Sequence, residues 1–277
     1  MSSNKNSYPA SVRDNVAYFK KQGIPVPPPH LLKTERQIEE IRKSCQVNIA
    51  VLNQVEKIVR AGISTAEIDR CVYQVTTDHW ALPAPLGYED YPKSVCTSIN
   101  DVICHGIPSE KEILKDGDII NVDCSTILNG YFSDSSRMYC IGDVSEENRK
   151  LVDVTKRCVE LGLEEVRPWK QIGDIGAAIN AYARENGYSV VAEIGGHGVG
   201  LEFHEDPYIC HTASRNTGML MVPGMIFTIE PMVNMGRAGF RIDRKNGWTV
   251  TTLDHKPSAQ WEIMVLVTET GHEVLCW

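Results

Sequence analysis

The chain has 277 residues, 42% of them hydrophobic and 23% charged, which is typical of a globular protein with one large core or two packed halves. Its net charge of -8 and the lack of a Lys/Arg cluster argue against a nucleic-acid-binding protein, because phosphate binding needs clustered cations. Nine cysteines, an odd number without C-x-x-C spacing, indicate reduced thiols instead of a disulfide framework or a zinc finger.

The N-terminal segment is predicted to lie outside the catalytic unit. Residues 1–7 lack the apolar stretch of a signal peptide, and no segment approaches about 18 uninterrupted apolar residues, so we expect a cytoplasmic protein without a membrane span. Residues 1–33 are polar and then proline-rich, which predicts an extended arm on the surface. We therefore expect an N-terminal extension, 1–33, and a single catalytic domain, 34–277.

Two helices are predicted after this arm. Thr34 can cap a long helix whose apolar positions recur at helical spacing until Gly62 ends it. Ser64 and Glu67 form a capping box that begins a second helix, which ends near Trp80.

The remaining elements repeat this order. Strands are predicted at 94–99, 118–128 and 131–141, and helices at 145–166 and 174–187. Strand patterns then return at 225–233, 248–253, 262–268 and 273–276. Helix, helix, strands therefore occurs twice, which predicts a mixed α/β (α+β) protein of two similar halves that pack their sheets together and hold a site between them.

Two aspartates are predicted to lie on one face of a β-hairpin. Asn129-Gly130 favours the two positive φ angles of a type I′ turn, and a two-residue loop places Ser125 opposite Asp134. Asp123 shares a face with Ser125, so Asp123 and Asp134 become diagonal neighbours with Cβ atoms about 7 Å apart. Such carboxylates could hold two metals about 3.5–4 Å apart. A β-bulge would shift this register by one residue.

Three further candidate ligands follow downstream. His197 lies among glycines that let the backbone approach an ion, although a histidine in a glycine-rich turn is often merely solvated. Glu230 and Glu262 lie in apolar runs, where a carboxylate must be protonated, paired or metal-bound. Ion pairs with Arg241 or Arg244 are the structural alternative.

The charges of these groups favour metal. Four carboxylates brought together without cations would repel one another and raise their pKa values. Two divalent cations would cancel the four negative charges.

Seven sequence blocks match one family in its own order: Tyr91–Cys96, Cys104–Pro108, Asn121–Asp123, Gly196–Gly200, Phe203–Pro207, Thr228–Met232 and Ser258–Glu262. Over roughly residues 34–277 the chain resembles the type I methionine aminopeptidases. The resemblance implies their pita-bread fold, two pseudo-symmetric halves with antiparallel sheet inside and helices outside.

The resemblance also implies a dinuclear metal centre and its ligands: Asp123, Asp134, His197, Glu230 and Glu262. Oxygen donors with one imidazole suit Mn, Fe, Co or Zn and do not choose among them. In the implied reaction, hydroxide attacks the scissile carbonyl and Glu230 handles its proton. His204 stabilises the oxyanion, and His105 contacts the scissile amide.

Further residues come from the same resemblance. The implied substrate-binding residues are Tyr88, Tyr91, Cys96, His105, Phe203, His204 and Trp248. Aromatic walls and a soft sulfur suit methionine's thioether, although these residue types are also ordinary core filler. A weaker match suggests a site for Na⁺ or K⁺ at Asn100, Val102 and Ser258.

Three departures from the family pattern lie beside the ligands. Pro85 stands where a cysteine is common, Phe132-Ser133 replaces a His-Gly pair, and Ile263 replaces a frequent histidine. They affect the surroundings of the ligands more than the reaction class.

The implied function is removal of the initiator methionine from nascent chains with a small second residue. The expected partners of this monomeric enzyme are N-terminal methionyl peptides and, transiently, the ribosome. Two alternatives compete: an X-Pro-type aminopeptidase of the same fold, and a non-catalytic binding relative. Cleavage of Met-Ala-Ser and not of Ala-Pro peptides would distinguish a methionine aminopeptidase from an X-Pro-type enzyme. The presence of all five ligands argues against the non-catalytic relative.

Overall fold

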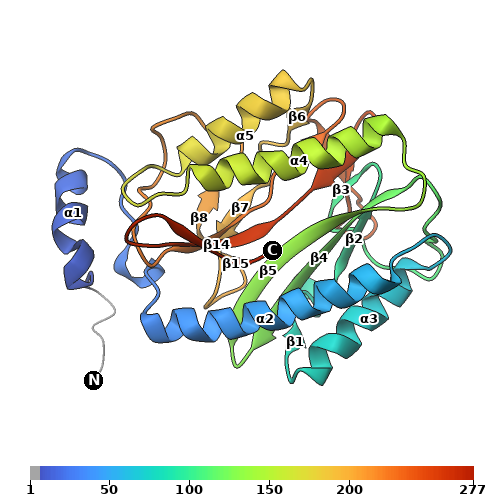
Figure 1. Ribbon diagram of the computed structural model, residues 1–277, viewed down its shortest axis with the longest axis horizontal. Coiled ribbons are helices and arrows are strands. Elements are labelled where there is room, and N and C mark those ends of the chain that lie inside the picture. The colour runs from blue at the N-terminus through green and yellow to red at the C-terminus, as the bar shows by residue number, and fades with distance from the viewer. Residues whose placement is uncertain (1–6) are drawn as a thin grey trace.

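The computed structural model describes residues 7–277 (Figure 1). The expectation that residues 1–7 form no signal peptide therefore concerns residues that lie almost entirely outside the described part. Within residues 7–277, no helix is both long and apolar enough to cross a membrane.

The first half begins with two helices, α2 (Glu35–Ile58) and α3 (Thr65–Asp78). Both start with a capping box, in which the hydroxyl of Thr34 or Ser64 accepts a hydrogen bond from the backbone N–H three residues later and the side chain there bonds back. The two predicted helices are therefore confirmed, although α2 ends before Gly62.

The predicted hairpin follows as β4 (Ile119–Leu128) and β5 (Tyr131–Cys140), paired without a bulge. The φ angles of its turn are 53° at Asn129 and 83° at Gly130, as a type I′ turn requires. Its sheet also contains β1 (Leu82–Pro83) and β2 (Cys96–Ile99), both paired with β4.

The second half repeats the plan with α4 (Glu146–Glu164), which Ser145 caps, and α5 (Gly173–Glu185). Its main sheet has the order β15-β14-β9-β7-β8. These strands are β7 (Gly196–Gly198), β8 (Glu205–Ile209), β9 (Ile226–Ile229), β14 (Ile263–Val267) and β15 (His272–Cys276).

Two small sheets complete the fold. One contains β3 (Val102–Cys104), β11 (Phe240–Ile242) and β12 (Val250–Thr252), and the other β6 (Ser189–Val190), β10 (Met232–Asn234) and β13 (Ser258–Gln260). The single strand predicted at 225–233 is thus two strands, β9 and β10. The break falls at Pro231, which has no N–H for a strand ladder.

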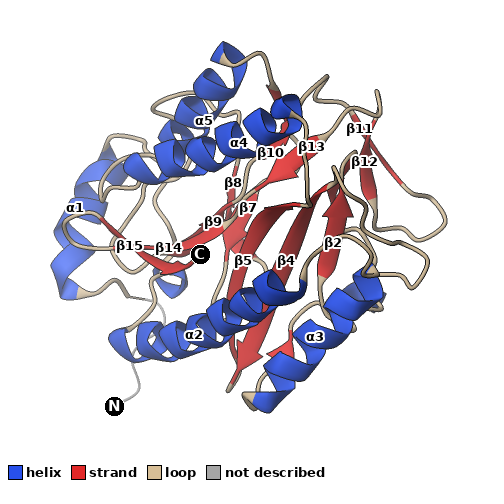
Figure 2. Cartoon of the chain, turned by 45° about the vertical axis from the view of Figure 1, so that its right-hand side comes forward, coloured by secondary structure: helices blue, strands red, loops and turns tan. Residues whose placement is uncertain are grey.

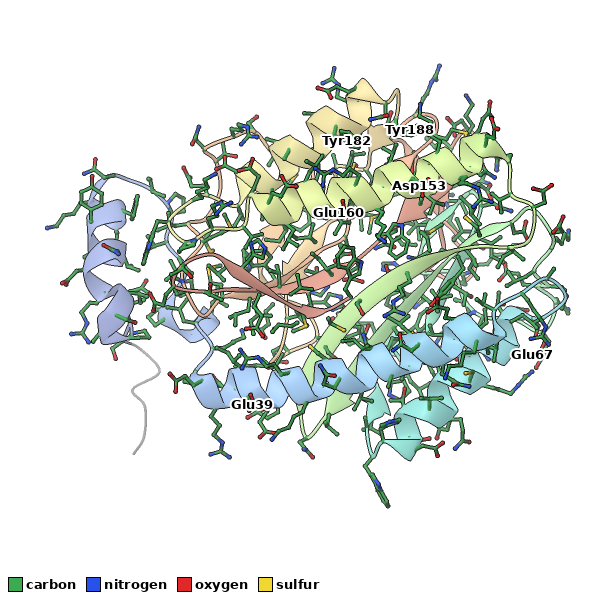
Figure 3. All side chains as sticks on the ribbon, in the orientation of Figure 1. Glu39, Glu67, Asp153, Glu160, Tyr182 and Tyr188 are labelled. Carbon is green, nitrogen blue, oxygen red and sulfur yellow. The ribbon has the colours of Figure 1, made fainter. Side chains whose placement is uncertain are left out.

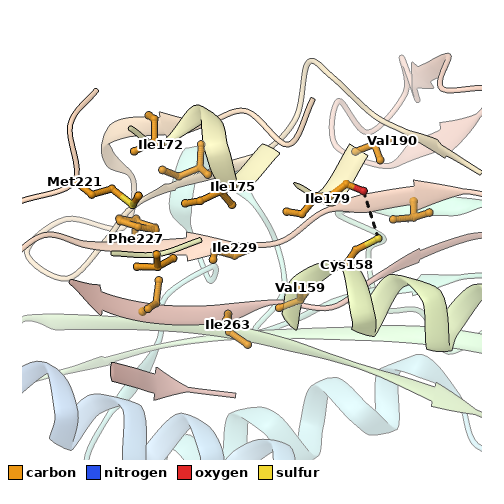
Figure 4. Close-up of a cluster of buried hydrophobic side chains, with 14 of the residues drawn as sticks. Cys158, Val159, Ile172, Ile175, Ile179, Val190, Met221, Phe227, Ile229 and Ile263 are labelled. Carbon is orange, nitrogen blue, oxygen red and sulfur yellow. Dashed lines mark hydrogen bonds between the residues drawn. The ribbon is translucent and has the colours of Figure 1, made fainter. Parts of the chain in front are cut away.

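The helices lie outside the sheets, α2 and α3 over the first half and α4 and α5 over the second (Figures 1 and 2). Charged residues such as Glu39, Glu67 and Asp153 project from their outer faces (Figure 3). Their inner faces are apolar: Ile175 and Ile179 of α5 belong to a fully buried cluster with residues of β9 and β14 (Figure 4). This layering agrees with the expected two-half architecture.

The prediction of an extended arm is wrong for part of the N-terminal segment. Residues Ala10–Lys21 form a helix, α1, whose Val12 and Val16 are buried in the same cluster as the second half. The ring of Phe19 stacks on Trp169 with centroids 6.1 Å apart. These apolar residues recur four and three positions apart, so one helix face can pack against the body.

Candidate metal centre

The hairpin brings its two aspartates to one face, as its turn predicted. Ser125 pairs with Asp134 and Ser136 with Asp123, so the two carboxylates are diagonal neighbours. The Ser125 hydroxyl donates to Asp134 Oδ1 over 2.8 Å. Asp123 Oδ1 is buried and has no hydrogen-bond partner among residues 7–277. An acceptor left in this state points to a cation.

The second half supplies the other three candidate ligands from its central strands. His197 lies in β7, Glu230 directly follows β9, and Glu262 directly precedes β14. His197 Nε2 lies 3.7 Å from Asp134 Oδ2 and 3.6 Å from Glu230 Oε1. Donor atoms of Asp134, His197 and Glu262 all lie within 4.8 Å of one another.

The imidazole of His197 is held with one nitrogen free for a metal. Its Nδ1 lies 2.9 Å from the carbonyl oxygen of Gly198, which can only accept, so Nδ1 carries the proton. Burial lowers the pKa of His197 to about 3, and the ring is therefore neutral. Nε2 then presents its lone pair to the surrounding carboxylates.

The four acids are protonated more readily than ordinary ones. Burial raises the pKa of Asp123 to about 7 and that of Glu230 to about 8. Burial, and then the charges of the neighbouring acids, also raise the pKa values of Asp134 and Glu262. This cluster of four acids therefore lacks a positive charge that would stabilise the ionised carboxylates.

The two arginines considered as ion-pair partners do not supply this positive charge. Arg241 and Arg244 are exposed, and Arg241 donates from Nε to the hydroxyl of Thr251. The ion-pair alternative for Glu230 and Glu262 is therefore wrong. The donor set of four carboxylates and one neutral imidazole, with an unpartnered oxygen among them, fits divalent cations.

Three residues that the sequence interpretation missed hold Glu230. Thr228 donates from its hydroxyl to Oε1 over 2.7 Å, and Gln260 Nε2 donates to Oε2 over 3.1 Å. The backbone N–H of Glu230 donates to Nε2 of His211, a fully buried histidine. Thr228 and Gln260 precede Glu230 and Glu262 by two positions, so the two-residue period of a strand could have identified them.

A pocket of about 400 Å³ opens over these ligands. The five candidate ligands line it together with every predicted substrate-binding residue: Tyr88, Tyr91, Cys96, His105, Phe203, His204 and Trp248. Pro85, Ile194 and Tyr208 line it as well and had not been predicted as pocket residues.

His105 and Trp248 share one wall of this pocket. Pairing of β3 with β12 brings them together, with ring centroids 5.8 Å apart and an edge-on arrangement. Tyr91 meets the same indole edge-on at 5.2 Å, and its hydroxyl donates to the carbonyl oxygens of Val95 and Gly106. Burial lowers the pKa of His105 to about 4, so this ring is neutral.

His204 also lines the pocket, among other rings. Its centroid is 4.3 Å from that of His197 and 4.4 Å from that of Phe203. Its Nδ1 lies 3.0 Å from the hydroxyl of Tyr88. Tyr88 lies in a short 3₁₀ turn with a left-handed residue, Glu89, at φ 45°. Within the described part of the chain the contact with Tyr88 is the one hydrogen bond of the His204 ring, so its second nitrogen is available to a substrate in the pocket.

The unusual residues beside the ligands are accommodated by packing. Phe132 stacks on Phe203 at 6.0 Å, and Ser133 exchanges a 2.9 Å hydrogen bond with Ser44 of α2. Ile263, the first residue of β14, is fully buried in the hydrophobic cluster of the second half.

The residues expected to bind a monovalent cation lie near one another. Asn100 has a left-handed φ of 51°, and its carbonyl oxygen accepts from the backbone N–H of Ser258 over 2.8 Å. Val102 begins the adjacent β3. Cation binding here stays a prediction.

Comparison with known proteins agrees with this geometry. Residues 39–269 match metallopeptidase family M24. Methionine aminopeptidase A of Synechocystis sp. is 46% identical over 88% of this chain and 96% of its own length. The crystal structure of methionine aminopeptidase from Rickettsia prowazekii superimposes with a TM-score of 0.87 at 41% identity, covering 89% of this chain and 99% of that one. The prolidase of Pyrococcus horikoshii, at 19% identity and a TM-score of 0.71, shares the fold alone.

Proposed function

The chain belongs to the methionine aminopeptidases of metallopeptidase family M24, and on that premise we propose that it removes N-terminal methionine from peptides with a small second residue. One observation carries the proposal: four carboxylates, of which Asp134, Glu230 and Glu262 are buried, and a neutral imidazole converge in a pocket that also contains aromatic rings and Cys96. The fold is the pita-bread fold that the sequence implied.

We infer that five residues would hold two divalent cations: Asp123, Asp134, His197, Glu230 and Glu262. When bound, the cations supply Lewis acidity and lower the pKa of water toward neutrality. Mn, Fe, Co and Zn all suit these donors.

The protein's own groups would bind the substrate and move protons. The Glu230 carboxylate, held through both oxygens by Thr228 and Gln260, takes up a proton from the attacking water. His204 donates from Nε2 to the oxyanion, which requires Nδ1 to accept from the hydroxyl of Tyr88. His105, which lines the same pocket, contacts the scissile amide.

The residues that line the pocket suit a methionine side chain. Cys96 pairs with Asp123 across β2 and β4, so its sulfur lies next to a proposed ligand. Tyr91 and Trp248 provide apolar faces for an unbranched thioether.

Peptide release tests this proposal. After metal loading, the protein should release methionine from Met-Ala-Ser and leave Ala-Pro peptides uncleaved, and Asp123→Ala should abolish release. Cleavage of Ala-Pro peptides instead would indicate an X-Pro-type enzyme. Retained activity in Asp123→Ala would contradict the proposed centre.

We also infer that the protein works in the cytoplasm and meets its substrates at the ribosome as a monomer. The nine free cysteines support a reducing compartment.

A further inference from the structure

The loop that carries His204 into the pocket is held by an acidic side chain that does not itself line the pocket. Glu205 Oε1 accepts two backbone hydrogen bonds, from the N–H of Leu201 over 2.7 Å and from that of Glu202 over 3.0 Å. Its other oxygen, Oε2, contacts the ammonium group of Lys33. Both carboxylate oxygens are thus engaged, and none of these four residues lines the pocket.

We propose that Lys33 and Glu205 are positioning residues for His204. This assignment rests on the proposed function only in the catalytic role that it gives to His204. Neither side chain lines the pocket. Lys33 belongs to the N-terminal segment, which the sequence indicated to be uninvolved in catalysis.

Burial makes this ion pair sensitive to the loss of either partner. The side chains of Lys33 and Glu205 are 1% and 8% exposed. A buried carboxylate without its cation must take up a proton or move toward water. Either response would weaken its grip on the N–H groups of Leu201 and Glu202.

The anchor of Lys33 is the central sheet of the second half. The backbone N–H of Lys33 donates to the carbonyl oxygen of Gly224 over 2.8 Å, and Gly224 donates to Val267 of β14 over 2.9 Å. A continuous chain of contacts therefore runs from β14 through Lys33 and Glu205 to the loop of His204 and fixes the loop relative to the sheet.

The loop is also fixed on the pocket side. Glu205 begins β8 and pairs with Gly198 of β7, next to His197. His204 contacts Tyr88 through Nδ1 over 3.0 Å. Two sets of contacts therefore restrict the imidazole, those of Glu205 with the loop and that of Tyr88 with the ring. A displacement of about 1 Å can lower a rate about a hundredfold.

The competing explanation is that the pair only stabilises the N-terminal segment. A control comes from Arg42 and Glu273, a more exposed ion pair with contacts of 2.9 and 2.7 Å that joins α2 to β15. Neither residue lines the pocket, and neither touches the His204 loop.

The test compares three variants in metal-loaded, full-length protein with a Met-Ala-Ser peptide. Lys33→Met should lower kcat about tenfold to a hundredfold and change KM less than about threefold, because the substrate pocket is intact. Adding Glu205→Gln should restore much of kcat, since a neutral amide oxygen still accepts both N–H groups without a buried charge. Arg42→Met should retain kcat.

Amide hydrogen exchange gives a readout independent of catalysis. Exchange at Leu201 and Glu202 should accelerate in Lys33→Met and slow again in the double variant, at a temperature where each protein is fully folded. Unchanged kcat and exchange in Lys33→Met would overturn the proposal, as would a double variant no better than the single one. If the wild-type protein released no methionine, the proposed function would fail while the exchange measurements would still decide the anchoring.

Discussion

The backbones of Ser136 and Glu262 exchange two hydrogen bonds, with N···O distances of 3.4 and 3.3 Å. This isolated bridge joins the hairpin of the first half to the start of β14 in the second. It brings Glu262 beside the two aspartates of the hairpin. The proposed metal ligands therefore come from both halves and meet where their sheets meet.

Metal binding should stabilise the protein most at alkaline pH. The acids of the centre have folded-state pKa values above their ordinary ones, so the folded protein holds protons that the unfolded chain releases. Stability is lost as pH rises toward the folded pKa of about 8 at Glu230. Buried His197 and His211, with pKa values of about 3, reduce stability only below about pH 6.5, where the unfolded chain binds protons.

The measurement is the Tm in the presence of a chelator between pH 6.5 and 8. The Tm should fall across this window, and Mn²⁺ or Co²⁺ should raise it most at pH 8. A flat or rising Tm in metal-free protein would contradict the assigned shifts. Glu262→Gln should reduce the slope.

Thr228→Val should weaken metal binding about tenfold to a hundredfold. The Thr228 hydroxyl accepts from the backbone N–H of His197 over 3.0 Å and donates to Glu230, so it orients two ligands at once. Chelator competition measures the affinity. Thr228→Ser should keep it, and Thr251→Val, outside the site, serves as the control; equal affinities in all three would refute the role.

His204→Ala should lower kcat about 10²- to 10³-fold without changing metal content, because the ring is assigned to the oxyanion and not to the metals. His197→Ala should instead lose metal. Steady-state kinetics together with elemental analysis separate the two outcomes. Metal loss in His204→Ala would show that the roles are wrongly divided.

Tyr88→Phe should lower kcat about tenfold and leave the fold intact. The variant removes the hydroxyl 3.0 Å from His204 Nδ1, so the tautomer with a proton on Nε2 loses its partner. Nitrogen-15 NMR of the imidazole in zinc-loaded protein reports the tautomer. The same tautomer and the same kcat in both proteins would exclude this effect.

We propose that α1 is an integral brace of the catalytic domain at 34–277. Val16→Ala should lower the free energy of unfolding by about 2 kcal/mol, because this valine is buried against the second half. Asn15→Ala, on the exposed face of the same helix, should change it by less than about 0.5 kcal/mol. Denaturant unfolding of both variants decides, and equal stabilities would indicate that α1 is dispensable.

Sequence reasoning worked best where one local pattern determined the geometry. The dipeptide Asn129-Gly130 set the turn, the turn set the register, and the register placed Asp123 and Asp134 on one face. The capping boxes placed the starts of α2 and α3 for the same reason. Each of these inferences spans about a dozen residues or fewer.

Contacts between distant segments escaped it. Lys33 and Glu205 are separated by 172 positions, and nothing local to either residue shows that they pair. Short strands such as β6 and β13 form because a neighbouring strand is present, not because of their own composition. The helix α1 was hidden by its polar residues, although Val12 and Val16 already stood one turn apart.

The depth of the ligands has a consequence for timing. Asp123 Oδ1 is buried, and the rings of Tyr88 and Trp248 line the same pocket, so the amino group of a substrate protein, the client, must enter between side chains to reach the ligands. Each residue of an extended strand reaches only about 3.3–3.6 Å, so several residues behind the methionine have to be straight and unattached to anything else. A client whose first strand or helix has already packed into its folded structure cannot present such an extended N-terminal segment. Removal of the methionine must therefore take place before the N-terminal region of the client folds.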